Sequence, residues 1–289
     1  MNFLEVAILR WYSANLTAGF AAGPFPFGLA FDGGNIWVAN NGGNNVTKLR
    51  ACDGANLGTF AVGTSPEGVA FDGANIWVTN FGSNNVTMLR ASDGTSLGTF
   101  GAGTGPEGVA FDGVNIWVAS SGSNNVTKLR ASDGANLGTF AAGNQPRAVA
   151  FDGANIWVTN RLSNNVTKLR ASDGTNLGTF AVGTFPLGVA FDGASIWVTN
   201  ANGNSVTKLR ASDGANLGTF AVGTGPRAVV FDGVHVWIAN TLTNNVTKLR
   251  ASDGANLGTF TVGNAPQNMA FDGANIWVSN SANNTLSKL

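Results

Sequence analysis

The sequence predicts an all-β protein built as a seven-bladed β-propeller, with four antiparallel strands in each blade. The tripeptide Phe-Asp-Gly recurs seven times at a constant spacing of 40 residues, from Phe31 to Phe271. Forty glycines and eight prolines indicate many tight turns, and no window shows helical periodicity. Seven copies of a 40-residue unit with four apolar runs each are typical of propeller blades.

One repeat, residues 66–103, shows the four strands expected in every blade. The runs at 68–71, 75–79, 85–90 and 97–100 are rich in Val, Ile, Trp, Phe and Thr, which favour strands. Asp-Gly turns, a polar loop and Gly-Pro segments separate them. A β-solenoid is the alternative architecture, but it needs shorter rungs.

The chain of 289 residues is seven units plus nine residues, which predicts how the ring closes. Residues 267–289 are expected to supply the first three strands of the last blade. The segment 16–20 then supplies its outermost strand, so that no sheet edge stays exposed. Residues 6–10 and 286–289 both align with a third strand, and the C-terminal copy is closer to the consensus. We therefore expect residues 286–289 in that position and a single propeller domain over 1–289.

Composition excludes several classes of function. Sixteen basic residues balance sixteen acidic ones, which excludes the basic surface of a nucleic-acid binder. No apolar run reaches 18 residues, so no membrane association is expected. One Cys and one His allow neither an internal disulfide nor a His-based metal site. We expect a monomer without a cofactor. The start of the chain lacks the features of a signal peptide; its compartment stays open, secretion and the cell surface included.

Two sets of repeated side chains are expected to serve the scaffold. Large aromatic residues at one position of every unit predict packing between blades rather than a stacking platform. They are Trp37, Trp77, Trp117, Trp157, Trp197, Trp237 and Trp277. The Phe-Asp-Gly aspartates are expected to cap their own turns, the alternative being a cation held by their ring. They are Asp32, Asp72, Asp112, Asp152, Asp192, Asp232 and Asp272.

Three isolated features carry no predicted chemistry. His235 stands where most units have Asn, and Cys52 stands where most have Ser, which is consistent with single substitutions. Cys52 has no basic neighbour in its turn to activate a thiolate. Residues 103–108 match the glycine spacing of a dinucleotide-binding loop, but a strand follows them where that loop needs a helix.

Differences between the repeats concentrate in two loops. One connects the fourth strand of a unit to the first strand of the next, and the other follows the second strand. Strands of a blade alternate in direction, so both loops lie on one face of the disk, here called the variable face. The nearly invariant Asp-Gly turns lie on the opposite face, here called the constant face.

A ligand site is predicted where the variable face surrounds the channel, and no catalytic or metal-ligating residue is assigned. Its candidate residues are Phe27, Glu67, Phe81, Glu107, Arg147, Arg161, Phe185, Leu187, Arg227 and Gln267. Loops that vary on a constant scaffold commonly carry binding function; the alternative is neutral drift. The three Arg side chains flank Phe185 and Leu187, which predicts an anionic ligand. The competing arrangement pairs Arg147 with Glu107.

Two motifs carry a resemblance to known families. Ile-Trp-Val-Thr-Asn at 76–80 and Pro-Glu-Gly-Val-Ala at 66–70 resemble the YVTN-type propeller repeat, with Trp in place of Tyr. They are also similar to blades of the virginiamycin B lyases, which open streptogramins, over about residues 16–289. The resemblance implies a propeller fold, a His after the innermost Pro in two blades, a Glu after the second strand, and a magnesium ion.

The residues at those matched positions differ from the family pattern. After the innermost Pro stand Phe27, Glu67, Glu107, Arg147, Leu187, Arg227 and Gln267. The second strands end in Asn40, Asn80, Ser120, Asn160, Asn200, Asn240 and Asn280. We therefore predict a non-enzymatic binding or interaction propeller for a small molecule, glycan or peptide. The alternatives are a streptogramin-type lyase, with Glu67 or Glu107 as a substitute base, and a purely structural repeat protein.

Overall fold

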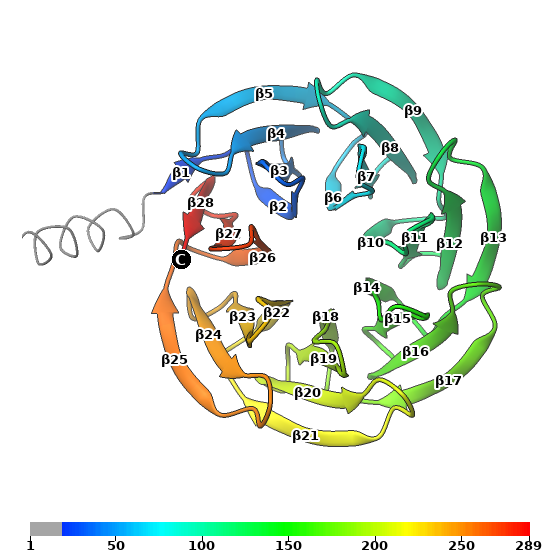
Figure 1. The fold of residues 1–289 in the computed structure, drawn as a ribbon, viewed down its shortest axis with the longest axis vertical. Helices are drawn as coiled ribbons and strands as arrows, with labels where there is room; N and C mark the ends of the chain where they lie inside the picture. The colour runs from blue at the N-terminus through cyan, green and yellow to red at the C-terminus, as the bar shows by residue number, and fades with distance from the viewer. Residues whose placement is uncertain (1–18) are drawn as a thin grey trace, which may run out of the picture.

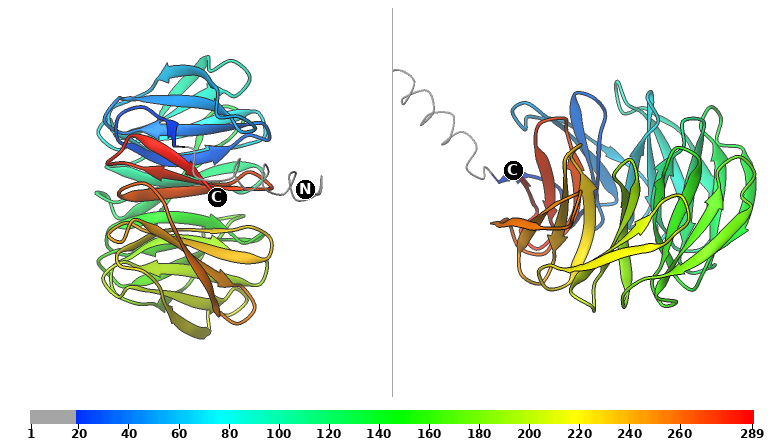
Figure 2. Two further views of the ribbon diagram at one scale, coloured as in Figure 1. Left: turned by 90° about the vertical axis from the view of Figure 1, so that its left-hand side faces the viewer. Right: turned by 60° about the horizontal axis from the view of Figure 1, so that its bottom comes forward.

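Seven four-stranded antiparallel sheets stand around a common axis in the computed structural model, which describes residues 19–289 (Figure 1). Each sheet runs outward from the axis, and the side view shows the resulting disk with its two faces (Figure 2). Among the described residues no helix has the length and hydropathy needed to cross a membrane. The predicted seven-bladed all-β propeller is confirmed.

The strands nearest the axis and their neighbours begin and end at equivalent residues in each blade. The innermost strands are β2 (Pro26–Phe31), β6 (Pro66–Phe71), β10 (Pro106–Phe111), β14 (Pro146–Phe151), β18 (Pro186–Phe191), β22 (Pro226–Phe231) and β26 (Pro266–Phe271). The second strands are β3 (Asn35–Asn40), β7 (Asn75–Asn80), β11 (Asn115–Ser120), β15 (Asn155–Asn160), β19 (Ser195–Asn200), β23 (His235–Asn240) and β27 (Ile276–Asn280). Each innermost strand begins two residues earlier than predicted, at the Pro.

The outer half of each blade repeats in the same way. The third strands are β4 (Asn45–Arg50), β8 (Asn85–Arg90), β12 (Asn125–Arg130), β16 (Asn165–Arg170), β20 (Ser205–Arg210), β24 (Asn245–Arg250) and β28 (Thr285–Lys288). The outermost strands are β5 (Asn56–Ala61), β9 (Ser96–Gly101), β13 (Asn136–Ala141), β17 (Asn176–Ala181), β21 (Asn216–Ala221), β25 (Asn256–Thr261) and β1 (Phe20–Ala21).

The ring closes by strand exchange, as predicted. The outermost strand is Phe20–Ala21, whereas the prediction placed it at 16–20, of which residues 16–18 lie outside the described residues. The last sheet has the order β1-β28-β27-β26, so an N-terminal strand completes a blade made by the C-terminus. Phe20 pairs with Leu286 and Ala21 with Thr285 in antiparallel register. The third position is filled by β28, and the competing segment 6–10 lies outside the described residues.

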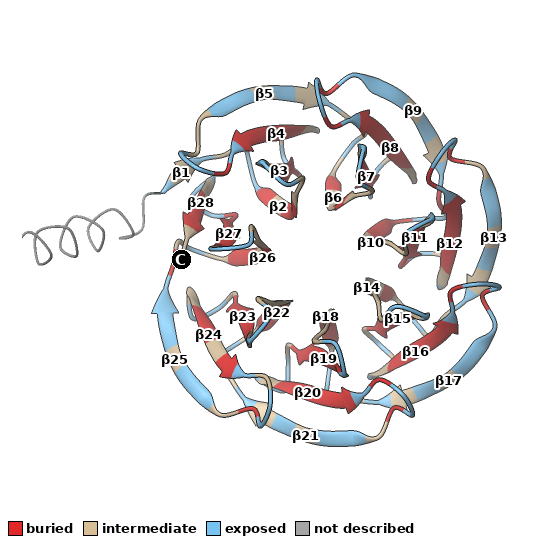
Figure 3. Cartoon of the chain, viewed as in Figure 1, coloured by how far each residue is buried: buried red, intermediate tan, exposed pale blue. Residues whose placement is uncertain are grey.

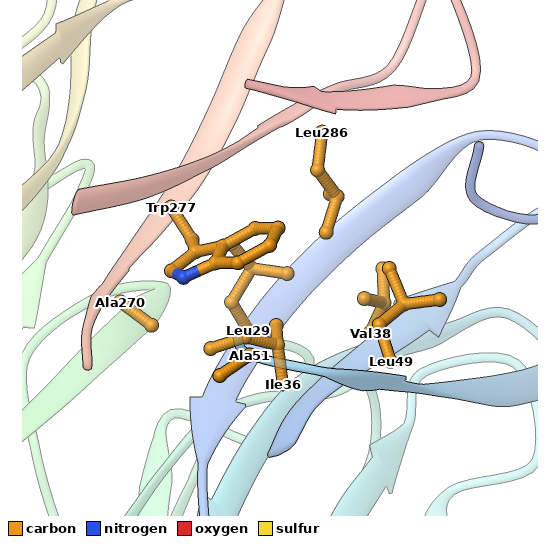
Figure 4. Close-up of a cluster of buried hydrophobic side chains, with 8 residues drawn as sticks. All are labelled: Leu29, Ile36, Val38, Leu49, Ala51, Ala270, Trp277 and Leu286. Atoms are coloured by element: carbon orange, nitrogen blue, oxygen red, sulfur yellow. The ribbon is translucent and has the colours of Figure 1, made fainter. Parts of the chain in front are cut away.

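Hydrophobic clusters between adjacent blades form the core. At the closing junction, Trp277 and Leu286 of the last blade pack with Leu29, Ile36 and Leu49 of the first (Figure 4). Second and third strands are buried almost throughout, whereas the outermost strands are largely exposed (Figure 3). The Trp side chains therefore pack between blades, as predicted.

The aspartates of the constant face cap their turns and also hold the Trp side chains. Asp32 Oδ1 accepts hydrogen bonds from the N–H groups of Gly34 (2.9 Å) and Asn35 (2.7 Å). Its Oδ2 accepts from Trp37 Nε1 at 2.8 Å, a contact that the sequence analysis did not anticipate. Burial raises the pKa of Asp32, but these hydrogen bonds outweigh burial and hold it below its usual value.

His235 takes over the role of the Asn found in most other blades. Its Nδ1 lies 3.2 Å from Asp232 Oδ2, and in the first blade Asn35 Nδ2 donates to Asp32 Oδ2 at 3.0 Å. The substitution therefore preserves the local contact. No group of three or more His, Cys, Asp or Glu that would suit a metal ion occurs within residues 19–289.

Candidate functional site

The loop before each innermost strand has one backbone conformation although its sequence varies. The residue before Pro has a positive φ in every blade, for example 54° at Phe25 and 61° at Phe185. Its N–H donates to an Asn side chain of the preceding blade, as from Phe185 to Asn164 Oδ1 at 2.9 Å. Because an Asn that never varies holds the backbone, the side chain presented by the loop is free to change.

A β-bulge then turns the residue after Pro toward the channel. In the second blade Pro66 pairs with Asn80 and Val69 with Val78, so that two residues oppose one. The same irregularity follows the innermost Pro in all seven blades. Bulges re-aim side chains in this way. Seven side chains, one from each blade, thus point to the axis on the variable face.

These side chains line a cavity of about 240 Å³ at the channel mouth. Seven of the ten candidate residues line it: Phe27, Glu67, Glu107, Arg147, Leu187, Arg227 and Gln267. Below them the wall is apolar and includes Leu29, Val69 and Val109. Phe81, Arg161 and Phe185 are not among the lining residues and belong to the surrounding loops.

Arg147 bridges the two acidic residues of the mouth. Its Nη1 forms an ion pair with Glu107, which is 4% exposed, and its Nη2 lies 3.5 Å from Glu67 Oε2. Burial raises the pKa of Glu67 to about 7, although the Arg147 charge opposes the shift. The neighbouring Glu107 charge adds to the rise. The competing arrangement of the sequence analysis, Arg147 paired with Glu107, is therefore the one present.

Arg227 has no carboxylate partner among the described residues. Its guanidinium lies over the Phe27 ring, 4.5 Å from the ring centroid, and reaches across the intervening seventh blade. Burial, and next the charge of Arg147, lower the pKa of Arg227 to about 9, so it stays protonated at neutral pH. A guanidinium carries five N–H donors and one positive charge, and in residues 19–289 no carboxylate lies within ion-pair distance of this one.

Arg161 is engaged outside the cavity. Its Nε donates to Gln145 Oε1 at 2.9 Å, and its guanidinium lies 5.2 Å from the centroid of the Phe185 ring. The predicted arc of three Arg therefore separates into three situations: Arg147 in ion pairs, Arg161 held by Gln145, and Arg227 over an aromatic ring. Of these three, Arg227 alone both lines the cavity and has no carboxylate within ion-pair distance among the described residues.

Gln267 and Leu187 complete the lining between the charged residues. Gln267 Nε2 donates to Ser281 Oγ at 2.9 Å, while its Oε1 is buried without a hydrogen-bond partner in the part of the chain that the structure describes. Leu187 is 7% exposed. An amide and an aliphatic side chain occupy the position held by Glu and Arg elsewhere, so the bulge accepts neutral residues.

The positions at the end of the second strands do not face the mouth. Asn40 is fully buried, and its Nδ2 donates to Asn45 Oδ1 at 2.7 Å and to Thr47 Oγ1 at 2.8 Å. Two exposed apolar residues of the variable face, Leu162 (49% exposed) and Leu242 (72%), were not among the predicted site residues. The residue type also varies between blades at this position, which directly follows that of Arg161 and Thr241, and this variation could have indicated them.

Comparisons with known proteins agree on the fold. The structure superposes on hydrazine synthase of Kuenenia stuttgartiensis with a TM-score of 0.82 and 19% identity, over 92% of this chain and 95% of that chain. A streptogramin B lyase gives 0.81 and 18%, over 94% and 96%. The virginiamycin B lyase of Staphylococcus aureus gives 0.81 and 17%, over 94% and 98%.

These similarities show that the chain shares its propeller fold with the two lyases. No protein-family model matches the sequence, and no curated protein matches it either. Structures at 17–19% identity establish the fold alone, and a scaffold of this kind hosts unrelated functions. Function must therefore be argued from the residues of the mouth.

Proposed function

We propose that this protein is a binding propeller that takes a small anionic ligand at the channel mouth of its variable face. The observation that carries the proposal is Arg227, whose charged guanidinium lies over Phe27 with no carboxylate within ion-pair distance among residues 19–289. A guanidinium suits the geometry of carboxylate and phosphate groups. Phe27 and Leu187 line the same cavity and provide apolar surface for the rest of the ligand.

The size of the cavity favours a small ligand or one end of a longer one. Its volume of about 240 Å³ lies below the roughly 300–1,000 Å³ of pockets for drug-sized molecules. Such a site fits one acidic sugar, one sugar phosphate or the carboxylate end of a peptide. It contributes charge and orientation, and the exposed loops around it add contacts for a longer molecule.

Calorimetric titration at low salt tests the proposal with uronic acids, sugar phosphates and N-acetylated amino acids. We expect at least one class to bind, and Arg227→Gln to weaken that binding about tenfold or more. Gln is a suitable replacement because Gln267 occupies the equivalent position in the next blade. If no anion binds, or if Arg227→Gln binds equally well, the proposal is wrong.

Streptogramin ring opening is the second candidate, and one observation favours it. Glu67 faces the mouth with its pKa raised to about 7, mainly by burial, and a general base works best when its pKa is near the working pH. Against it stands Arg147, whose Nη2 lies 3.5 Å from the same carboxylate. The two functions differ in whether the bound molecule is changed.

Incubation with virginiamycin B and magnesium, followed by mass spectrometry, separates the two candidates. We expect no ring opening above the uncatalysed rate, because the site lacks the His that the lyase resemblance implies. Ring opening that disappears in Glu67→Gln would replace binding by catalysis as the function. His introduced at positions 227 and 267 provides the companion test of whether the scaffold supports the chemistry.

A further inference from the structure

The charges of the channel mouth are separated into an acidic side and a basic side. On the acidic side, the carboxyl groups of Glu67 and Glu107 share the single guanidinium of Arg147. On the basic side, Arg227 over Phe27 has no carboxylate within ion-pair distance in the described part of the chain. Arg227 thus lines one cavity with Glu67 and Glu107 without forming an ion pair with either of them.

A ligand with an anionic group alone satisfies only the basic side of this arrangement. A carboxylate that reaches Arg227 enters a cavity that also holds Glu67 and Glu107, whose charges repel it. Glu67 itself shows that its charge is incompletely compensated, since burial raises its pKa to about 7 in spite of Arg147. A cation placed beside Glu67 would compensate the charge of its carboxylate.

We propose that the ligand is a small zwitterion, with its carboxylate on Arg227, its ammonium on the Glu67 side of the mouth, and its apolar part against Phe27 and Leu187. This inference rests on the proposed function and narrows it to amino acids and related amino carboxylates. A zwitterion complements both sides of the mouth and carries no net charge into the partly buried cavity, where an unmatched charge is costly. Arg147 keeps its contacts with Glu67 and Glu107 in this arrangement.

Matched ligands separate the contribution of each charge. L-leucine has both charges and an apolar side chain, N-acetyl-L-leucine has only the carboxylate, and L-leucine amide has only the ammonium. A second trio, 5-aminopentanoate, pentanoate and pentylamine, tests a longer separation of the charges. We expect at least one zwitterion to bind about tenfold more tightly than both of its partners, measured by calorimetry at neutral pH and low salt.

Two variants assign the charges to residues. Glu67→Gln should weaken the zwitterion about tenfold and strengthen binding of the matched carboxylate, because a repulsive charge has been removed. Arg227→Gln should weaken binding of the zwitterion and of the matched carboxylate. This opposite response of two ligands to Glu67→Gln cannot arise from misfolding, which would weaken both together. Gln267 at the equivalent position shows that the strand accommodates Gln.

The outcomes distinguish failure of this inference from failure of the proposed function. If the carboxylate-only ligands bind as tightly as the zwitterions, the mouth is a simple anion site and the inference is wrong, while the proposed function stands. If only the amines bind, or if nothing binds at millimolar concentration, both are wrong. If Glu67→Gln weakens the zwitterion and its matched carboxylate equally, Glu67 does not recognise the ammonium, and the inference is again wrong.

Discussion

Carboxyl groups on the two faces of the disk have opposite surroundings. On the constant face, Asp32 accepts hydrogen bonds from two backbone N–H groups, from the Asn35 side chain and from Trp37. Its pKa falls although burial acts against the fall. On the variable face, Glu67 has one long contact with a guanidinium that it shares with Glu107, and burial prevails. The constant face satisfies its own polar groups, whereas the variable face keeps charges that a ligand can satisfy.

The two faces can differ in this way because the backbone of the mouth is held by constant residues. Asn side chains of the preceding blade fix the loop before Pro, and a bulge after Pro aims the next side chain at the axis. Neither device depends on the side chain that is displayed. Glu, Arg, Phe, Leu and Gln therefore occupy one position on the same backbone, and the mouth acquires its chemistry without a change of fold.

The largest effect is expected from a core residue that links to the constant face. Trp117→Ala removes a side chain that packs against Ile156 and leaves Asp112 Oδ2 without the indole N–H at 2.7 Å. A Trp-to-Ala change in a core costs about 3–5 kcal/mol. Urea unfolding should show this loss of stability.

Ligand binding at the mouth should change little in the folded Trp117→Ala protein, because Trp117 does not line the cavity and its cluster reaches the apolar wall at Val149, below the charged residues. Trp117→Phe is the matched control and should lose less stability, since it keeps part of the packing. A change in the affinity of the channel mouth for its ligand, at a temperature where the variant is fully folded, would show that the two faces are coupled.

A pH dependence of stability is the second expected effect, and it arises on the variable face. The folded protein holds the Glu67 proton up to a pKa of about 7, whereas the unfolded carboxyl releases it near 4.5. The contribution of Glu67 is therefore full below pH 4.5 and is lost as the pH rises to about 7, a fall of roughly 1–3 kcal/mol.

Urea unfolding of the wild type and of Glu67→Gln across this pH range measures that contribution as the difference between the two slopes. Asp32 on the constant face does not interfere, because its pKa is lowered from 3.8 and it changes stability only at more acid pH. Equal slopes for the two proteins would show that the Glu67 charge is compensated, and would weaken the contrast between the faces.

The repeated sequence pattern was enough to predict the scaffold. The contacts of the site could not be predicted, because they are made by long side chains that reach across the channel. The 40-residue period and the Asp-Gly and Gly-Pro punctuation were enough for the blades, the closure and the two faces. The bond from Trp37 to Asp32 was missed, although the constant spacing of five residues between them was a signal. No signal showed that Arg147 would reach Glu67 two blades away, because that contact depends on channel width and on rotamers.

The smallest effect is expected in the second blade, where Met88 replaces the Lys found at the equivalent position in the other six blades. In the first blade Lys48 Nζ donates to Ala91 O at 2.7 Å in the next blade and lies over the Trp37 ring. Lys128 makes the equivalent contacts with Ala171 O and Trp117. Met88 occupies this position in the second blade and forms neither.

Met88→Lys should therefore supply a missing link between the second and third blades and raise stability by about 0.5–1.5 kcal/mol. The gain is small because a buried ammonium must lose its water, which offsets much of the new hydrogen bonding. Lys48→Met is the matched reverse change and should lower stability by a similar amount. Urea unfolding measures the free energy of unfolding of both variants. Ligand titration should find the affinity of the channel mouth unchanged in each. If Met88→Lys destabilises the protein while Lys48→Met does not, the repeated Lys is tolerated rather than stabilising, and the constant face owes its uniformity to the Asp-Gly turns alone.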